Sequence, residues 1–407
     1  MDFSIPDAQQ KKLQTAQRFI ETNVVPLEAR LVSGESWFDL EPALYALRDE
    51  VKALGLWAPN LPAEEGGTFE NLVFLGLLSE VLGYTPLGHF VFGCQAPDAG
   101  NAELLHLQGT QEQKERFLAP LARGDVRSCF AMTEPATAGS NPTLLEARAE
   151  LVDGEWVING RKWFTSSADG ANFTIAMVVT EPEAQKHQRA SMILVPFDTP
   201  GLSMIRNIPV MGHAGSGYFS HAEIEFKDCR VPEGNLLGGR GEGFLLAQQR
   251  LGPGRIHHAM RWLGICRRAQ DELCKYVSGR AINARETLAD QQIVQTWIAE
   301  NAAEIAASRA LTLETAWLLD ERGFHAAREH VALVKFQSAN TLQRVVDRAL
   351  QAHGSLGMTD DTILAFYYRE ERAARIYDGP DEVHKMTVAK KILKRYRNTD
   401  ATSAAAE

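Results

Sequence analysis

The amino-acid sequence predicts an α+β fold in which a helical region, a β region and a second helical region follow one another. Apolar residues recur with helical spacing over residues 1–125, and short runs rich in Val, Ile, Trp and Phe lie between turn signals over 126–238. Four long helical patterns then fill residues 239–397. We therefore expect an N-terminal α-helical domain, a middle barrel-like β domain and a C-terminal four-helix bundle.

The composition is that of an ordinary globular protein. The chain has 407 residues, 45% of them hydrophobic and 23% charged, which is enough for two or three structural units. The formal net charge of -10 argues against nucleic acid as a partner, because phosphate binding requires an excess of Lys and Arg. Five cysteines without a CxxC pair indicate a reducing compartment and no structural metal. Since there is no secretory segment and no apolar run of the roughly 18 residues that span a membrane, we expect a cytoplasmic protein.

The N-terminal region contains one clearly amphipathic segment, residues 8–25. Its apolar face is formed by Leu13, Ala16, Phe19, Ile20 and Val24. Further helices are predicted over 41–55 and 71–83. The segment 110–124 begins with a threonine cap and ends at a glycine, which is typical of a helix.

The middle region carries the signals of an antiparallel sheet. Asp153-Gly154 and Asn159-Gly160 are both residue pairs that favour a hairpin turn. Apolar strands are predicted over 172–180 and 191–197, and alternation of apolar and polar residues predicts another over 221–232, where a proline ends the run.

The C-terminal region is expected to form the bundle from segments 243–277, 290–323, 326–354 and 381–396. Pro253 is expected to break or kink the first of these helices. Pro380 suits the first position of the last helix, which follows an Asp-Gly-Pro turn. The small and polar residues 398–407 are expected to be a disordered tail.

Four motifs narrow the interpretation, because they occur in a characteristic order along essentially the whole chain. They are FAMTEPATAGSNP (130–142), the segment 210–244 that closes in FKDCRVPEGNLLGGRGEGF, QAHGSLGM (351–358) and RIYDGPDEVHK (375–385). Together they resemble the signature motifs of the FAD-dependent acyl-CoA dehydrogenases. The sequence RLGPGRIHHAMR (250–261) is similar to the branch that in animals is fused to a kinase-like domain.

The resemblance implies that the middle domain holds the flavin of FAD. The implied flavin-binding residues are Phe130, Met132, Thr133, Gly139, Ser140, Phe164 and Ser166. In the family, the threonine bonds the pyrimidine edge of the ring, an aromatic residue at position 164 stacks on it, and the hydroxyl at 166 bonds flavin N5. Ser140 would face a flavin phosphate and the substrate. The loop is one residue longer here than the family pattern, and Asn141 replaces an aspartate.

The resemblance also implies contacts to the dinucleotide from the C-terminal domain. The implied residues are Arg280, Gln291, Gln351, Gly354, Ser355, Pro380 and Glu382. In the family an arginine at position 280 reaches the FAD pyrophosphate of a neighbouring subunit, a role that suits a guanidinium. Asn283 stands where the family has an aromatic residue. A site shared in this way implies a homodimer or homotetramer.

The implied reaction is the dehydrogenation of an acyl-CoA to a 2-enoyl-CoA, as in fatty acid β-oxidation. Asp378 stands at the family's glutamate position and would remove the α-proton, while flavin N5 accepts the β-hydride. Arg255, Tyr377 and Gly379 would contact the substrate. Some family members carry the base near position 254, but Gly254 cannot serve. An electron-transferring flavoprotein is the expected electron acceptor.

The aspartate in place of glutamate leaves alternatives open, because it is one methylene shorter. The site could accept a differently shaped acyl group, or the enzyme could be an oxidase, since nitroalkane oxidases with this fold use an aspartate here. The branch resemblance suggests a 4-hydroxyacyl-CoA or 4-phosphoacyl-CoA substrate whose phosphate would meet His213, His221 or His257. A weakly active homologue that acts as a binding or scaffold protein is the remaining alternative.

Overall fold

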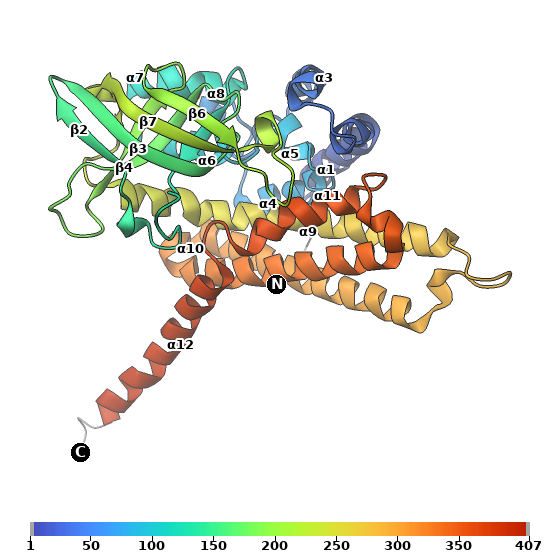
Figure 1. Ribbon diagram of the computed structural model, residues 1–407. Coiled ribbons are helices and arrows are strands. Elements are labelled where there is room, and N and C mark those ends of the chain that lie inside the picture. Colours follow the sequence, from blue (N-terminus) through green and yellow to red (C-terminus); the bar gives the residue numbers. More distant parts are fainter. Residues whose placement is uncertain (1–3, 404–407) are drawn as a thin grey trace. The chain divides into compact units, whose positions relative to one another are not determined.

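The computed structural model describes residues 4–403 and has the predicted α+β organisation: helices, then strands, then helices. Packing divides the chain into two compact units (Figure 1). The first contains Met1–Glu28, Asn71–Gly88 and Gly254–Glu407, and the second contains Ala29–Glu70 and His89–Pro253. This division cuts across the three regions of the sequence, because segments of the N-terminal helical region contribute to both units.

The second unit is built on one sheet of eight strands. They are β1 (Ser128–Ala131), β2 (Arg148–Val152), β3 (Glu155–Ser166), β4 (Phe173–Val179), β5 (Ala190–Pro196), β6 (Leu202–Asn207), β7 (His221–Pro232) and β8 (Leu236–Leu237). The order is β6-β7-β3-β2-β4-β5-β8, with β1 parallel to β4. Side chains from β1 to β5 and from β7 share one buried core, in which Trp156 and Phe226 are the largest. Strand β6 was not predicted, since its largely exposed side chains give no alternating pattern.

The two predicted hairpin turns have different outcomes. Asp153 and Gly154 do form the turn between β2 and β3, with φ of 52° and 82°. The prediction for Asn159-Gly160 is wrong, because both residues lie inside β3 where its register with β7 shifts. A Cβ atom on Gly160 would lie 2.5 Å from the Cβ of Ala147, so this glycine permits a close approach of two segments.

The helices of the second unit include α3 (Trp37–Ala53), α5 (Gly88–Val91), α6 (Asp98–Gln108), α7 (Gln111–Gln113) and α8 (Ala119–Arg123). Thr110 forms the expected cap, in a capping box with Gln113, and Gly124 ends α8 in the left-handed conformation. Asp98 at the start of α6 accepts hydrogen bonds from the N–H and hydroxyl of Ser128, at 2.7 and 2.6 Å. The polar start of this helix therefore holds the start of β1.

The first unit is helical. Its elements are α1 (Asp7–Phe19), α4 (Leu72–Leu82), most of α9 (Gly243–Gly279), α10 (Gln292–His353), α11 (Ile363–Glu370) and α12 (Asp381–Ser403). Gly323, at φ 70°, interrupts α10 and produces the two separate helices that were predicted. Of the break or kink expected at Pro253, the break does not occur, since α9 is one helix through this residue.

The N-terminal helices of this unit are joined to α9 by a buried ion pair and to α10 by an exposed cap. Arg268 donates to both carboxylate oxygens of Glu28, at 3.0 and 2.9 Å. Asp320 accepts from the N–H groups of Leu72 and Val73 and so caps α4.

Helix α12 extends away from α10 in Figure 1 and continues to Ser403, into the segment 398–407 that was predicted to be a disordered tail. Residues 404–407 of that segment lie outside the described residues. Within residues 4–403, no helix combines the length and the apolar character that crossing a bilayer requires.

Candidate functional site

The loop after β1 is fastened to β3, and this brings the predicted flavin motif beside the predicted flavin strand. The N–H of Trp163 donates to the carbonyl of Thr133 at 3.0 Å. The ammonium of Lys162 donates to the carbonyl of Met132 at 3.0 Å and to the carboxylate of Glu134 at 2.7 Å. Thr133 therefore lies next to the strand that carries Phe164 and Ser166.

The Lys162–Glu134 ion pair is fully buried within the second unit. Burial lowers the pKa of Lys162 to about 8, although Glu134 opposes the shift. Glu134 also accepts hydrogen bonds from the N–H groups of Glu146 and Ala147, at 2.6 and 3.0 Å. The carboxylate of Glu134 thus binds both to strand β3 and to the segment that leads into β2, so it holds both ends of the loop. Removal of either Glu134 or Lys162 would leave the other as an unpaired buried charge.

Strand β3 presents an aromatic ring and a hydroxyl. Phe164 adopts φ 48° and is 44% exposed, which is unusual for a phenylalanine in a sheet. The hydroxyl of Ser166 lies 2.8 Å from Nδ1 of His221, and burial lowers the pKa of that imidazole. An exposed aromatic face beside hydroxyl groups has the chemistry that a flavin ring requires of its protein, so these residues fit the cofactor that the sequence implies.

The remaining flavin-motif residues are close to this loop and strand. Phe130 lies in β1 with the guanidinium of Arg250 4.0 Å from its ring centre. A Cβ atom on Gly139 would lie 3.0 Å from the methyl group of Thr133, so the glycine backbone packs against that side chain. Ser140 is exposed.

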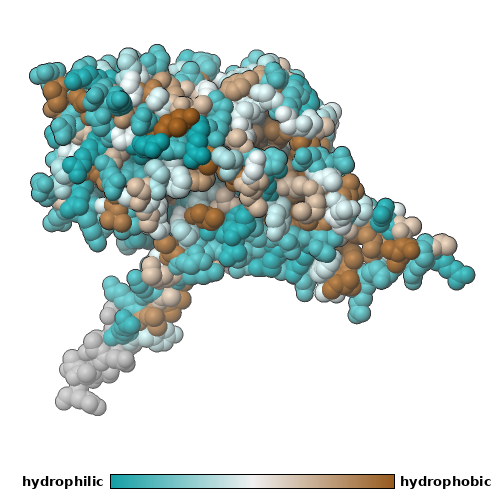
Figure 2. All heavy atoms as spheres, in the orientation of Figure 1, coloured by the Kyte–Doolittle hydropathy of each residue, from teal (hydrophilic) through white to brown (hydrophobic). Residues whose placement is uncertain are grey.

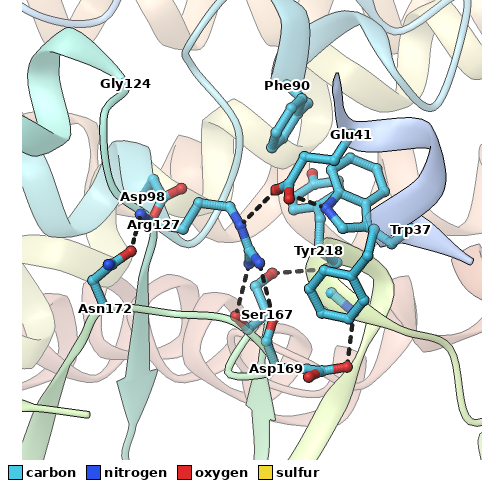
Figure 3. Close-up of polar contacts among 12 residues, drawn as sticks. Trp37, Glu41, Phe90, Asp98, Gly124, Arg127, Ser167, Asp169, Asn172 and Tyr218 are labelled. Carbon is cyan, nitrogen blue, oxygen red and sulfur yellow. Dashed lines mark hydrogen bonds and ion pairs between the residues drawn. The ribbon is translucent and has the colours of Figure 1, made fainter. Parts of the chain in front are cut away.

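A polar network supports the end of β3 (Figure 3). Arg127 donates to the carbonyls of Ser167 and Asp169, at 3.2 and 2.9 Å, and to the carboxylate of Glu41 at 3.2 Å. Glu41 accepts from the indole of Trp37, and the hydroxyl of Ser167 donates to the carbonyl of Tyr218, at 2.9 and 2.8 Å. The network fixes the turn that directly follows Ser166.

In the first unit, Asp378 lies on a strained turn just before α12. Its φ is 52°, and its carboxylate is 3.1 Å from Nε2 of His258. Its carbonyl accepts from Arg255 at 2.9 Å and from His384 at 3.2 Å. A Cβ atom on Gly254 would lie 3.4 Å from the Asp378 carboxylate, so the alternative base position is adjacent to the actual carboxylate.

Lys335 holds the turn around Asp378 by hydrogen bonds to its backbone carbonyls. Its ammonium donates to the carbonyls of Ala374 and Gly379, at 2.6 and 3.4 Å, and lies 5.4 Å from the ring centres of Trp262 and Tyr377. Burial lowers the pKa of this lysine to about 8, against the opposing effect of Asp378 and Asp381.

The stability of the protein should therefore depend on the charge of Lys335. Between pH 8 and 10.5 the folded chain binds fewer protons at this lysine than the unfolded chain, so a rise in pH stabilises the folded state. Relative to Lys335→Met, the free energy of unfolding of the wild type should increase by on the order of 2 kcal/mol across this range. Urea denaturation at each pH measures the free energy of unfolding of the two proteins. Replacement of the exposed Lys390 by methionine is the control, and parallel curves for the wild type and Lys335→Met would contradict the prediction.

The turn around Asp378 also holds the other predicted substrate residues. The hydroxyl of Tyr377 is 3.2 Å from donors of Arg261 and Trp262, and burial raises the pKa of this phenol. Pro380 immediately precedes α12, whose second residue is the exposed Glu382.

Five of the predicted dinucleotide residues lie near one end of the helices of the first unit, whereas Pro380 and Glu382 lie at the start of α12. Arg280 follows α9 and lies 6.0 Å from the ring of Tyr276, which stacks on His353 at 4.1 Å. His353 ends α10, and Gln351, Gly354 and Ser355 surround this end. The carbonyl of Arg280 accepts a hydrogen bond from the N–H of Leu288. This bond brings the loop that ends at Gln291 next to Arg280.

The predicted residues thus form three groups: the loop and strand of the second unit, the Asp378 turn, and the end of α10. The three histidines suggested for a phosphate do not form one group within a unit, since His213 and His221 belong to the second unit and His257 to the first. Sequence reasoning missed the supporting residues Glu134, Lys162, His258 and Lys335, because their partners are far away along the chain. The sequence signals were two lysines inside apolar patterns, Lys162 and Lys335.

Comparisons with known proteins identify the family of the chain. Three models of the acyl-CoA dehydrogenase family match: the N-terminal domain at residues 6–125, the middle domain at 129–229 and the C-terminal domain at 241–393. "Probable acyl-CoA dehydrogenase FadE2" of Mycobacterium tuberculosis is 42% identical over 92% of this chain and 91% of its own length.

Animal relatives are longer proteins. Acyl-CoA dehydrogenase family member 10 of Mus musculus is 41% identical over 95% of this chain, which spans 37% of that protein. Among solved structures, one from Mycobacterium abscessus is 37% identical with a TM-score of 0.92, covering 97% of this chain and 100% of its own. Butyryl-CoA dehydrogenase from Megasphaera elsdenii is 26% identical with a TM-score of 0.83 and the same coverage.

Proposed function

Since this chain belongs to the acyl-CoA dehydrogenase family, FAD-dependent oxidoreductases that act on CH–CH bonds, we propose that it dehydrogenates an acyl-CoA with Asp378 as the base. The observation that carries the proposal is the Asp378 turn. The carboxylate stands at the family's base position, on a backbone held by Arg255, His384 and Lys335. Such fixed geometry is what proton abstraction from carbon requires, because small misplacements of a base are costly.

The side chains of the two units have separate tasks in this proposal. Asp378 takes the α-proton, and Arg255, Tyr377 and Gly379 orient the thioester. Burial lowers the pKa of Arg255, with Asp378 opposing, but a guanidinium remains charged and suits an anionic substrate such as coenzyme A. When bound, FAD supplies the hydride acceptor, its N5. Thr133, Phe164 and Ser166 would hold the flavin ring.

We further propose that two or four copies assemble, with Arg280, Gln291, Gln351, Gly354 and Ser355 contacting the dinucleotide of a neighbouring copy. The exposed apolar residues of α12 support assembly; they are Met386, Ile392, Leu393 and Tyr396. Figure 2 shows hydrophobic surface along this projecting helix. Exposed apolar surface of this kind is typical of contacts between subunits. An electron-transferring flavoprotein would reoxidise the enzyme, which would act in fatty acid β-oxidation in the cytoplasm.

A panel of acyl-CoAs tests the proposal. The purified protein should be yellow, and anaerobic mixing with saturated acyl-CoAs that differ in length, branching and 4-substitution should bleach the flavin absorbance with at least one of them. The 2-enoyl-CoA should appear in equal amount by mass spectrometry. A colourless protein, or a yellow one that the whole panel leaves unbleached, would contradict the proposal and favour a binding or scaffold role.

The aspartate at position 378 favours one second candidate, an oxidase of the nitroalkane-oxidase kind. It differs from the dehydrogenase in its electron acceptor. An oxidase, once reduced, should be reoxidised by air within one turnover and release hydrogen peroxide. A dehydrogenase should remain reduced in air for many turnovers and be reoxidised quickly by an electron-transferring flavoprotein. Within the panel, faster bleaching by a 4-phosphoacyl-CoA than by its unsubstituted analogue would identify the 4-substituted substrate class.

A further inference from the structure

The geometry around Asp378 points to His258 as a positioning residue for the base. We infer that His258, through a hydrogen bond to one carboxylate oxygen, orients the other oxygen toward the α-carbon of the substrate. The inference rests on the proposed function, and it concerns the orientation of the aspartate that stands at the family's glutamate position. His258 acts through Asp378 and need not touch the substrate itself.

The imidazole of His258 is held between aromatic rings. It stacks on Trp262 with 17° between the ring planes and 5.7 Å between centres, and the ring of Tyr377 lies 4.7 Å away. Its side chain is 17% exposed and that of Asp378 is 19% exposed. Because the ring cannot turn freely between these neighbours, its Nε2 is directed at the carboxylate oxygen Oδ2, 3.1 Å away.

The chemistry of the pair fixes which atom carries the proton. An ionised carboxylate can only accept a hydrogen bond, so Nε2 of His258 must carry a hydrogen. The final torsion of an aspartate side chain is broad and roughly two-fold, and a bond to Oδ2 selects one orientation. The second oxygen, Oδ1, is then presented in one direction. The bond thereby reduces the number of carboxylate orientations that the base has to sample.

The charge of His258 matters as well as its position. Burial lowers the pKa of the imidazole, whereas Asp378 raises it and the nearby Arg261 and Lys335 lower it. A neutral donor leaves the carboxylate a stronger base than an imidazolium would, because a positive charge at 3.1 Å stabilises the ionised carboxylate. The base should therefore weaken as His258 becomes protonated.

The other charged groups at this turn have different tasks. Arg255 and His384 bond the carbonyl of Asp378, and Lys335 bonds carbonyls of the turn. Arg261 is paired with the carboxylate of Glu371. Among the contacts of Arg255, His384, Lys335 and His258, the one to the carboxylate group of Asp378 is made by His258, which separates its role from that of the backbone supports.

Two substitutions distinguish positioning from packing. His258→Gln keeps an N–H donor near the place of Nε2, whereas His258→Phe keeps the stacked ring and loses the donor. We expect His258→Phe to slow both flavin bleaching and the exchange of the acyl-CoA α-hydrogen with deuterium oxide by about 10- to 100-fold, with little change in KM. His258→Gln should recover to within about fivefold of the wild type. His330→Gln, at a partly exposed histidine paired with Glu314, is the control.

The pH profile provides the second readout. The acid side of the exchange rate should show two breaks in the wild type, one for each member of the coupled pair, and a single break in His258→Gln. If Phe and Gln reduce the rate equally, or if neither reduces it, the inference is overturned, since the ring would then matter only for packing or not at all.

A measurement without substrate keeps this test separate from that of the proposed function. The titration of His258 is followed by NMR of the histidine-labelled protein, assigned with His258→Gln. In Asp378→Asn its pKa should fall, because the carboxylate no longer stabilises the imidazolium. An unchanged titration would overturn the bond itself. A falling pKa together with no bleaching by any acyl-CoA would leave the pair in place and refute the dehydrogenase function.

Discussion

Replacing Asp378 by asparagine is expected to slow bleaching of the flavin by acyl-CoA by about 10²- to 10⁴-fold, which is the usual contribution of a general base. Asparagine has nearly the same shape and its amide oxygen can still accept the bond from His258, but it cannot take a proton from carbon. The substitution lies in the first unit, whereas the residues proposed to hold the flavin ring lie in the second. The purified variant should therefore stay yellow.

The measurement is anaerobic stopped-flow absorbance with the best acyl-CoA of the panel. Asp360→Asn makes the same chemical change at an exposed turn and should leave the rate unchanged. A variant Asp378→Asn that bleaches at the wild-type rate would refute the assignment of the base. Loss of the yellow colour would instead show that Asp378 is needed for the fold or for cofactor binding.

The fold was predictable where the signal is local. Asp153 and Gly154 satisfy the left-handed backbone of a tight turn, and this requirement can be read from the two residues alone. Gly323 divides two helices for a similarly local reason. Asn159-Gly160 carries the same pattern but sits inside a strand, because the absence of a side chain there serves a contact with Ala147. Two pairs with the same turn signal thus have different uses, and the segment that packs against each pair decides between them.

The site was predictable only for residues that a motif marks. Nothing in the local sequence marks His258, because its partner Asp378 lies on another element far along the chain. Lys162 and Lys335 interrupt apolar patterns without any neighbouring carboxylate that would explain them. Their partners are carbonyls and a glutamate on other segments. Periodicity describes which face of an element is buried, and it contains no information on what meets that face.

Gly379→Ala is expected to have the second large effect, through the backbone of the turn that carries Asp378. Gly379 has φ 104°, a conformation that residues with a side chain rarely adopt. An added Cβ atom would also lie 2.6 Å from Nε2 of His384, which donates to the carbonyl of Asp378. The turn must shift to relieve both conflicts, and Asp378 shifts with it. We expect a rate of flavin bleaching about 10²-fold lower and a loss of about 1–3 kcal/mol in the free energy of unfolding.

A second variant separates the two causes. In Gly379→Ala combined with His384→Ala, the contact with the imidazole is removed but the backbone strain remains. Stability should recover in part, while the rate stays low because the carbonyl of Asp378 has lost a donor. Gly234→Ala is the control, since a Cβ atom there meets nothing within 4 Å. Wild-type rate and stability in Gly379→Ala would mean that the turn tolerates movement, and the requirement for a fixed base at Asp378 would then fall with it.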